Sequence, residues 1–332
     1  MGFLLSLPIA SALALKCRKA LAETIPPACM LMIFVLYCAG FTGNFIPGIR
    51  GIAALSLCCL FYCLWHRIRK GAVLNRADYP VLCLYFFLML FFMAADYGRS
   101  VQRSDEFGHW ALAVKNYYLY NRYSNLPPAV DPNWNYPPFT TIWEYFCTRL
   151  WLGYSEGISY LGYQMLMISF LLPGLVSQNE GGMQSAAGKA GSDPRDGRTG
   201  EPLRDRRGGA TAEKTIAFGV CALLLPVMTY RGAYTSLLPD AFSGILAAYI
   251  LWMLQRGGQQ PSGRFYEVSA AAGMASLVLA KNNGVVLAAA IVLVYLLKRA
   301  FEDAGAGKGC RSFCRSAALY PAAVAGGYFS WE

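Results

Sequence analysis

The sequence contains little charge and little histidine. Only 14% of its 332 residues are charged and only two are histidine, whereas about a quarter of the residues in a soluble globular chain carry charge. The eleven cysteines lie mostly inside apolar runs, where cysteine acts as a small apolar residue, and their spacing indicates no disulfide framework. Cys310 and Cys314 have no companion histidines, which argues against a zinc site. The scarcity of charge excludes an ordinary soluble domain, and the placement of the cysteines excludes a disulfide-rich secreted scaffold.

Long apolar runs fill the chain instead. An uncharged apolar stretch of about 18 residues or more predicts a helix that spans a membrane. Such runs, some of them shorter, occupy residues 28–41, 51–65, 79–95, 158–176, 215–230, 238–254, 268–280 and 284–297 and the segment after Ser316. We therefore predict an all-α fold, a polytopic transmembrane helix bundle of about 8–9 spans with a helical outer loop. The run 3–15 is followed, not preceded, by basic residues, which favours a short or interfacial helix over a signal peptide.

The charges predict how the chain is organised across the membrane. Basic residues cluster between the apolar runs, as in cytoplasmic loops, and with Arg67–Lys70 in the cytoplasm, Asp105 lies on the outer face. The net charge of +10 is therefore interpreted as an excess of basic residues in cytoplasmic loops, and no nucleic-acid partner is expected. The predicted parts are N-terminal transmembrane helices (1–96), an extracytoplasmic loop with amphipathic helices and the candidate site (97–157), a transmembrane helix (158–176), a glycine-rich disordered cytoplasmic linker (177–213) and C-terminal transmembrane helices (214–332).

Two surface-lying helices are expected in the outer loop. The pair Ser104–Asp105 suits the N-cap of a helix that begins near Glu106, and an apolar face that contains Trp110 suits the membrane interface. A second helix is expected after Pro138, with Glu144 on its more polar side. These features predict that the loop 97–157 is folded. The linker 177–213 contains no aromatic residue and is therefore expected to be disordered.

The adjacent acids Asp105 and Glu106 are the first candidates for chemistry. Charge within or beside a membrane-spanning region is costly, which favours a functional interpretation. Helix capping by solvated acids is one alternative and general-base catalysis is another. His109 follows Glu106 by one helical turn, and a Glu-x-x-His pair on a helix can bind a metal. The cofactor therefore stays open, with a divalent metal ion as the candidate and Glu106 and His109 as its ligands.

Three later segments contain further polar candidates. Tyr136 belongs to an aromatic segment that suits either a membrane interface or the wall of a sugar-binding site. Arg231 and Asp240 lie at the two ends of a turn. Arg231 either marks the membrane surface or binds substrate, and Asp240 either caps the helix that follows or binds substrate. Lys281 lies between two apolar runs, where a lysine snorkels to the surface or binds a phosphate head group.

The order of these features resembles the GT-C class of integral membrane glycosyltransferases, which includes protein O-mannosyltransferases and the aminoarabinose transferase of lipid A. The resemblance rests on DEFGHW at 105–110, YPP at 136–138, the turn before Asp240 and Lys-x-x-Gly at 281–284. It covers residues 79–300. Members of the class use a polyprenyl-phosphate-linked sugar as donor and transfer the sugar on the outer face of the membrane.

The resemblance implies a set of roles. Asp105 is expected to be the catalytic base, with Glu106 beside it, and Lys281 and Arg231 to bind the lipid phosphate. Three further residues are expected to contribute to substrate binding: His109, Tyr136 and Asp240. The expected partners are the lipid bilayer, the polyprenyl-phosphate-linked donor and an unidentified acceptor, and the expected location is a bacterial plasma membrane.

Two other functions stay open from the residues alone. A transporter or flippase for a lipid-linked or small solute would explain charge near the membrane but is expected to contain inverted repeats, and no clear repeat is visible. A non-catalytic membrane protein would need neither Asp105 nor Lys281. The chain stops at YFSWE, inside or just after an apolar run, and is expected to be truncated at the C-terminus relative to the class.

Overall fold

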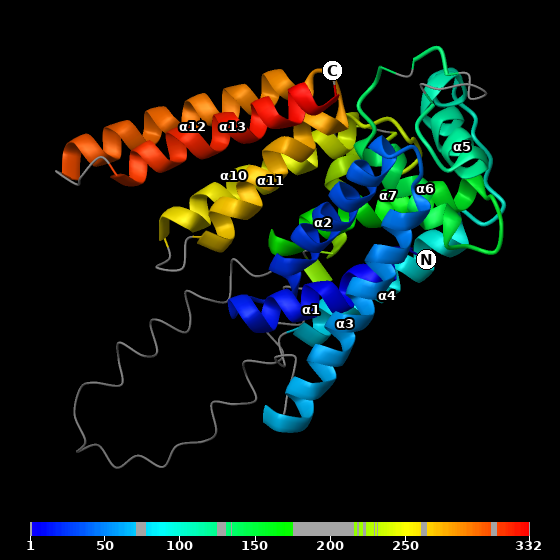
Figure 1. Ribbon diagram of the computed structural model, residues 1–332, viewed down its shortest axis with the longest axis horizontal. Coiled ribbons are helices and arrows are strands. Elements are labelled where there is room, and N and C mark those ends of the chain that lie inside the picture. The colour runs from blue at the N-terminus through cyan, green and yellow to red at the C-terminus, as the bar shows by residue number, and fades with distance from the viewer. Residues whose placement is uncertain are drawn as a thin grey trace.

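A computed structural model describes most of the chain (Figure 1). The described residues are 2–70, 78–124, 131–133, 135–174, 216–217, 219–221, 224–228, 230, 232–259, 264–306 and 311–331. Every regular element among them is helical, so the predicted all-α class is confirmed for this part of the chain. The linker predicted at 177–213 and Arg231 lie outside the described residues.

The described elements, in chain order, are all helical. They are η1 (Gly2–Leu5), α1 (Ser6–Cys17), α2 (Leu21–Phe41), α3 (Ile46–Lys70), α4 (Asp78–Ala95), η2 (Glu106–Trp110), α5 (Ala111–Tyr120), α6 (Phe139–Arg149), α7 (Glu156–Leu171), α10 (Asp240–Gln259), α11 (Arg264–Ala280), α12 (Gly284–Ala306) and α13 (Arg311–Trp331). The helices α10 to α13 lie side by side in Figure 1, and α1 and α3 lie on the other side of the molecule. Between the two groups, α2 contacts α1, α3 and α11, and α7 contacts α2, α4 and α10.

Four helices in the described part are long and apolar enough to cross a membrane. They are α2, α3, α4 and the first part of α12 (Gly284–Phe301), and they indicate a membrane protein. Most of the apolar run 158–176 forms α7, which is buried along nearly its whole length, and its assignment as a transmembrane helix stays a prediction. Its apolar side chains pack against other helices, and a packed core requires the same composition as a lipid-facing surface. The count of 8–9 spans therefore remains a prediction.

The outer loop differs from the expected pair of surface-lying helices. Residues 139 to 148 of α6 are all buried. The expected interfacial face, formed by Trp110 at the end of η2 and by Val114 and Tyr117 of α5, is also buried. The physical reason is that α6 is surrounded by α2, α5, α7 and α11, so its aromatic side chains have protein neighbours on every side. The loop is thus part of the core and positions the residues that follow α4.

The N-terminal run forms a short helix, as expected. The helix α1 packs against α2 and α3, and its side chains at Ile9 and Ala10 are buried. It ends where Arg18 adopts a left-handed backbone with φ of 56°. The next residue, Lys19, donates a hydrogen bond of 3.0 Å to the Tyr266 hydroxyl at the start of α11.

The bundle has two chemically different ends. At one end the starts of α2 and α4 meet, since the Leu21 amide donates to Asp78 at 3.0 Å, and Lys19 reaches Tyr266. At the other end of α11, Lys281 pairs with Asp240 at the start of α10. The candidate site residues gather at this second end.

Candidate functional site

One open cavity brings together residues from four segments that are far apart in the sequence. Its volume is about 420 Å³, and its walls are Ser104, Asp105, Gly108, His109, Trp110, Asn133, Tyr136, Leu238, Pro239, Asp240 and Lys281. Five residues selected from the sequence are among them, namely Asp105, His109, Tyr136, Asp240 and Lys281. The volume lies within the range of about 300–1,000 Å³ that is usual for small-molecule sites.

Asp105 offers an exposed carboxyl group to this cavity. Its backbone is helical, with φ of −68° and ψ of −31°, and its side chain makes no capping hydrogen bond. The expectation that Asp105 is an N-cap therefore fails, because the helical backbone begins earlier than predicted and Asp105 lies inside it. An acid that the helix does not use for capping is available to a ligand.

Among the described residues, Lys281 is the one lysine or arginine that lines the same cavity. Lys281 lies in the break between α11 and α12 and forms an ion pair with Asp240. The side chains keep 26% and 47% exposure, respectively, so the pair is open to a ligand. An anion that enters the cavity would meet the Lys281 ammonium group in competition with the Asp240 carboxylate.

A π-helical turn separates the roles of the two adjacent acids. In η2 the Ala111 amide donates to the carbonyl oxygen of Glu106, an i→i+5 bond that makes the turn wider than an α-helical one. Asp105 and His109 line the cavity, whereas Glu106 is fully buried. Turns of this kind are frequent at functional sites.

Glu106 connects three segments of the fold. Its carboxyl group accepts a hydrogen bond of 2.7 Å from the Tyr160 hydroxyl and one of 2.9 Å from the Leu237 amide. Glu106 is not among the residues that line the cavity. The structure thus places it as an anchor that holds the Leu237 segment, and with it Asp240, against η2.

Glu144 is a second buried acid, and sequence reasoning did not single it out. The side chain lies on α6 with no exposure, and neither carboxyl oxygen has a hydrogen-bond partner among the described residues. Burial, and to a smaller extent the nearby Glu106, raises the pKa of Glu144 well above its usual value. The only sequence signal was an acid within an aromatic helical segment.

His109 contacts a different acid from the one expected. Its Nδ1 lies 3.4 Å from the nearly buried Asp131, which also accepts a hydrogen bond of 2.9 Å from the Asn133 amide. The imidazole ring packs against the rings of Trp110 and Tyr136, at centroid distances of 4.4 and 4.7 Å. Sequence reasoning missed Asp131, because nothing in the local pattern places residue 131 beside residue 109.

The proposed metal ligands do not converge. Within the described residues no group of three or more His, Cys, Asp or Glu side chains could hold a metal ion. Glu106 is committed to Tyr160 and Leu237, and His109 faces Asp131. The residues therefore do not fit a protein-bound divalent cation at Glu106 and His109.

A second, mostly apolar cavity borders the first one. Its volume is about 430 Å³, and both cavities include Asp240 in their walls. The other walls are Leu171, Cys221, Leu225, Pro226, Tyr230, Ala241, Gly244, Ile245 and Ala248. The apolar cavity thus follows the first turns of α10, directly behind the ion pair.

The functional assignment of the chain rests on the geometry of this site. No protein-family model, no curated protein and no solved structure matches the chain.

Proposed function

We propose that the protein is a GT-C-like membrane glycosyltransferase that transfers a sugar from a polyprenyl-phosphate-linked donor to an acceptor on the outer face of the membrane. The observation that carries the proposal is the cavity in which the exposed carboxyl group of Asp105 shares a wall with the ammonium group of Lys281. A base and a phosphate-binding cation in one site are what this reaction requires.

Asp105 and Lys281 each have one role in the proposed reaction. Asp105 takes the proton of an acceptor hydroxyl, whose oxygen attacks the anomeric carbon of the donor sugar. The bond between the anomeric carbon and the phosphate oxygen breaks, and the polyprenyl phosphate leaves. Lys281 neutralises the charge that develops on this leaving group, and Asp240 orients Lys281 until the phosphate takes its place.

The neighbouring apolar cavity supports a lipid-linked donor. Its walls are largely apolar and meet the charged cavity at Asp240. The apolar chain of a donor would lie along α10 while its phosphate reaches Lys281. This arrangement favours a lipid phosphate over a soluble nucleotide sugar, which has no apolar chain to bury.

The distribution of basic residues supports an outer-face location. The cationic segments after α1 and at the end of α3 lie away from the site, and Lys19 contacts the start of α11, whose far end precedes Lys281. Under the positive-inside rule the cationic end is cytoplasmic. The proposed location is a bacterial plasma membrane, with about 8–9 spans in the complete bundle and residues 97–157 outside.

The direct test is transfer by the full chain in proteoliposomes with a polyprenyl-phosphate-linked sugar. We expect Asp105→Asn to lower the rate by about 10²–10⁴-fold, because general-base help is lost while donor binding is kept. Lys115→Gln is the matched control, since Lys115 is an exposed charge of the same loop that lines none of the described cavities. Full activity of Asp105→Asn would contradict the assignment of the base.

A flippase or transporter is the second candidate, and Glu144 is the observation that favours it. A buried carboxyl group with a raised pKa is a suitable carrier for a coupled proton. In the same vesicles, movement of the lipid-linked sugar without any transfer, abolished by Glu144→Gln and retained in Asp105→Asn, would favour this candidate over the transferase. Absence of both transfer and lipid movement in vesicles with the wild-type chain would favour a non-catalytic membrane protein.

A further inference from the structure

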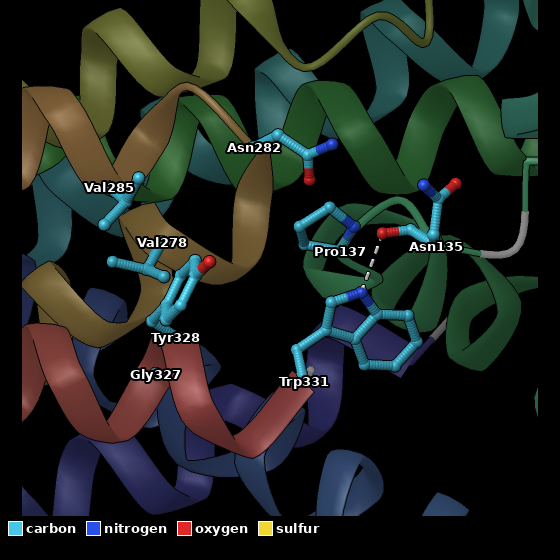
Figure 2. Close-up of a pocket in the computed structure, with 8 residues that line it drawn as sticks. All are labelled: Asn135, Pro137, Val278, Asn282, Val285, Gly327, Tyr328 and Trp331. Atoms are coloured by element: carbon cyan, nitrogen blue, oxygen red, sulfur yellow. Dashed lines mark hydrogen bonds between the residues drawn. The ribbon is translucent and has the colours of Figure 1, made fainter.

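A third cavity lies next to the charged one, and none of the described residues in its wall is charged. Its volume is about 510 Å³. Figure 2 shows the amide side chains of Asn135 and Asn282 toward the top of the view, with the rings of Tyr328 and Trp331 below them. The remaining wall comes from Pro137, Val278, Val285 and Gly327. Two amides and two aromatic rings are thus the groups that a ligand would meet.

The aromatic wall is held in place by contacts with the rest of the fold. The Trp331 Nε1 donates a hydrogen bond of 2.9 Å to the carbonyl oxygen of Asn135. The Trp331 ring also packs against Tyr123, with a centroid distance of 5.5 Å. At Gly327 an added Cβ would lie 3.2 Å from the carbonyl oxygen of Ala275, so α13 approaches α11 closely at this point. The cavity therefore has a built wall.

The chemistry of the wall selects a class of ligand. A phosphate or carboxylate group needs cationic partners, and no Lys or Arg is found among the wall residues that the structure describes. A purely apolar chain would desolvate two amide groups without replacing their hydrogen bonds. A neutral saccharide fits both parts, because its hydroxyl groups both donate and accept, as an amide side chain does, and its C–H faces pack against aromatic rings.

Two segments contribute to both this cavity and the charged one. Tyr136 and Lys281 line the charged cavity, and their immediate neighbours Pro137 and Asn282 line the neutral cavity. A saccharide in the neutral cavity would therefore lie beside the segment that carries Lys281, to which phosphate binding is assigned. This adjacency connects the neutral cavity to the proposed reaction.

We propose that the neutral cavity binds a saccharide that carries no charge, through the amides of Asn135 and Asn282 and the rings of Tyr328 and Trp331. Its role as the sugar moiety of the acceptor rests on the proposed transferase function, whereas binding itself does not. The saccharide can belong to a free oligosaccharide or to the head group of a neutral glycolipid, and both present the same hydroxyl groups.

The test is a binding titration of the full chain carrying Asp105→Asn, so that no transfer consumes the probe. The probes are maltose, lactose and cellobiose in solution, and nanodiscs that contain monoglucosyl-diacylglycerol, with inorganic phosphate as the charged comparison. Intrinsic tryptophan fluorescence is the readout, because Trp331 lies in the wall. We expect at least one neutral probe to bind and phosphate to leave the signal from this cavity unchanged. Binding in solution identifies a free saccharide, and binding only from nanodiscs identifies a lipid head group.

Matched variants separate the cavity from other surfaces. Asn282→Ala should weaken saccharide binding by about tenfold, the loss of roughly one well-placed hydrogen bond, and Asn283→Ala, in the same exposed turn, should not. Tyr328→Ala should also weaken binding, whereas Tyr328→Phe, which keeps the ring, and Phe329→Ala, on a side chain 75% exposed, should keep most of it.

Two outcomes would overturn the proposal. They are the absence of binding by every neutral probe, and equal affinity in Asn282→Ala and Asn283→Ala, with size-exclusion profiles confirming that both variants are folded. Because binding is measured in the Asp105→Asn background, its failure is distinguishable from failure of the transferase assignment. Saccharide binding together with full transfer activity of Asp105→Asn would uphold the site and reject the base.

Discussion

The carboxyl groups of Glu106 and Glu144 lie near each other in the interior but are treated differently by their surroundings. Two donors, the Tyr160 hydroxyl and the Leu237 amide, satisfy Glu106. No described residue donates to Glu144, and burial raises its pKa well above the usual value. The burial of Glu144 favours its neutral form. The pair therefore provides one anchor and one acid whose neutral form the fold favours.

This difference predicts a pH effect on stability. The folded protein holds the Glu144 proton more tightly than the unfolded chain, so this contribution is complete below the unfolded pKa of 4.5 and is lost as pH rises toward the folded pKa. At pH 8 Glu144→Gln should unfold at a midpoint higher than the wild type by on the order of 2–4 °C. The gain should shrink at pH 5. Thermal unfolding in micelles measures both, and a lower midpoint of the variant at pH 8 would indicate an ionised, partnered Glu144.

The connection between α11 and α12 is the element that presents Lys281. A Cβ atom at Gly284, the first residue of α12, would collide with the carbonyl oxygen of Leu277, so the two helices approach each other more closely there than a side chain allows. This tight hairpin determines where the break between the helices falls. It thereby determines the position of Lys281 opposite Asp240.

Gly284→Ala should therefore destabilise the hairpin and displace Lys281. We expect a loss of about 1–3 kcal/mol, as for overpacked sites, together with weaker binding of the polyprenyl-phosphate donor. Gly326→Ala is the control, because a Cβ at this helical glycine meets nothing within 4 Å, and alanine is the better helix former. Thermal unfolding and donor titration test both variants. Equal unfolding midpoints for Gly284→Ala and the wild type would show that the hairpin accommodates the added methyl group without a loss of stability.

At the scale of the whole molecule, the site and the basic clusters occupy different ends of the helices. The ion pair of Asp240 and Lys281 lies at one end of α11, and the contact of Lys19 with Tyr266 lies at the other. A membrane protein with this charge distribution is expected to keep its basic end in the cytoplasm. The cavity would then open to the outer face, where a lipid-linked donor is presented.

Cysteine labelling in intact cells tests this orientation. In a background without the eleven native cysteines, Lys115→Cys should react with a membrane-impermeant maleimide added from outside. Arg67→Cys, at an exposed position near the end of α3, should react only after permeabilisation, because the positive-inside rule places it in the cytoplasm. The reverse pattern would put Asp105 in the cytoplasm and contradict transfer on the outer face.

The sequence predicted the helical class, which the described residues confirm, and it drew attention to five residues that the structure places around one cavity. Apolar runs and isolated charges are local signals, so they can be read from the sequence, whereas the roles of the five residues stay predictions. The sequence did not predict the π-helical turn at Glu106, the contact of His109 with Asp131 or the full burial of α6. Each of these depends on neighbours that are distant along the chain.

The sequence by itself determined that the chain is helical, rich in membrane-compatible segments and sparing with charge, because hydropathy and charge are properties of each residue. Only the tertiary structure decided which apolar helices serve the core and which are available to lipid, since both environments require the same side chains. It also decided that Asp105, Asp240 and Lys281 meet at one cavity while Glu106 turns away from it. Helix packing brings together positions that no local spacing relates.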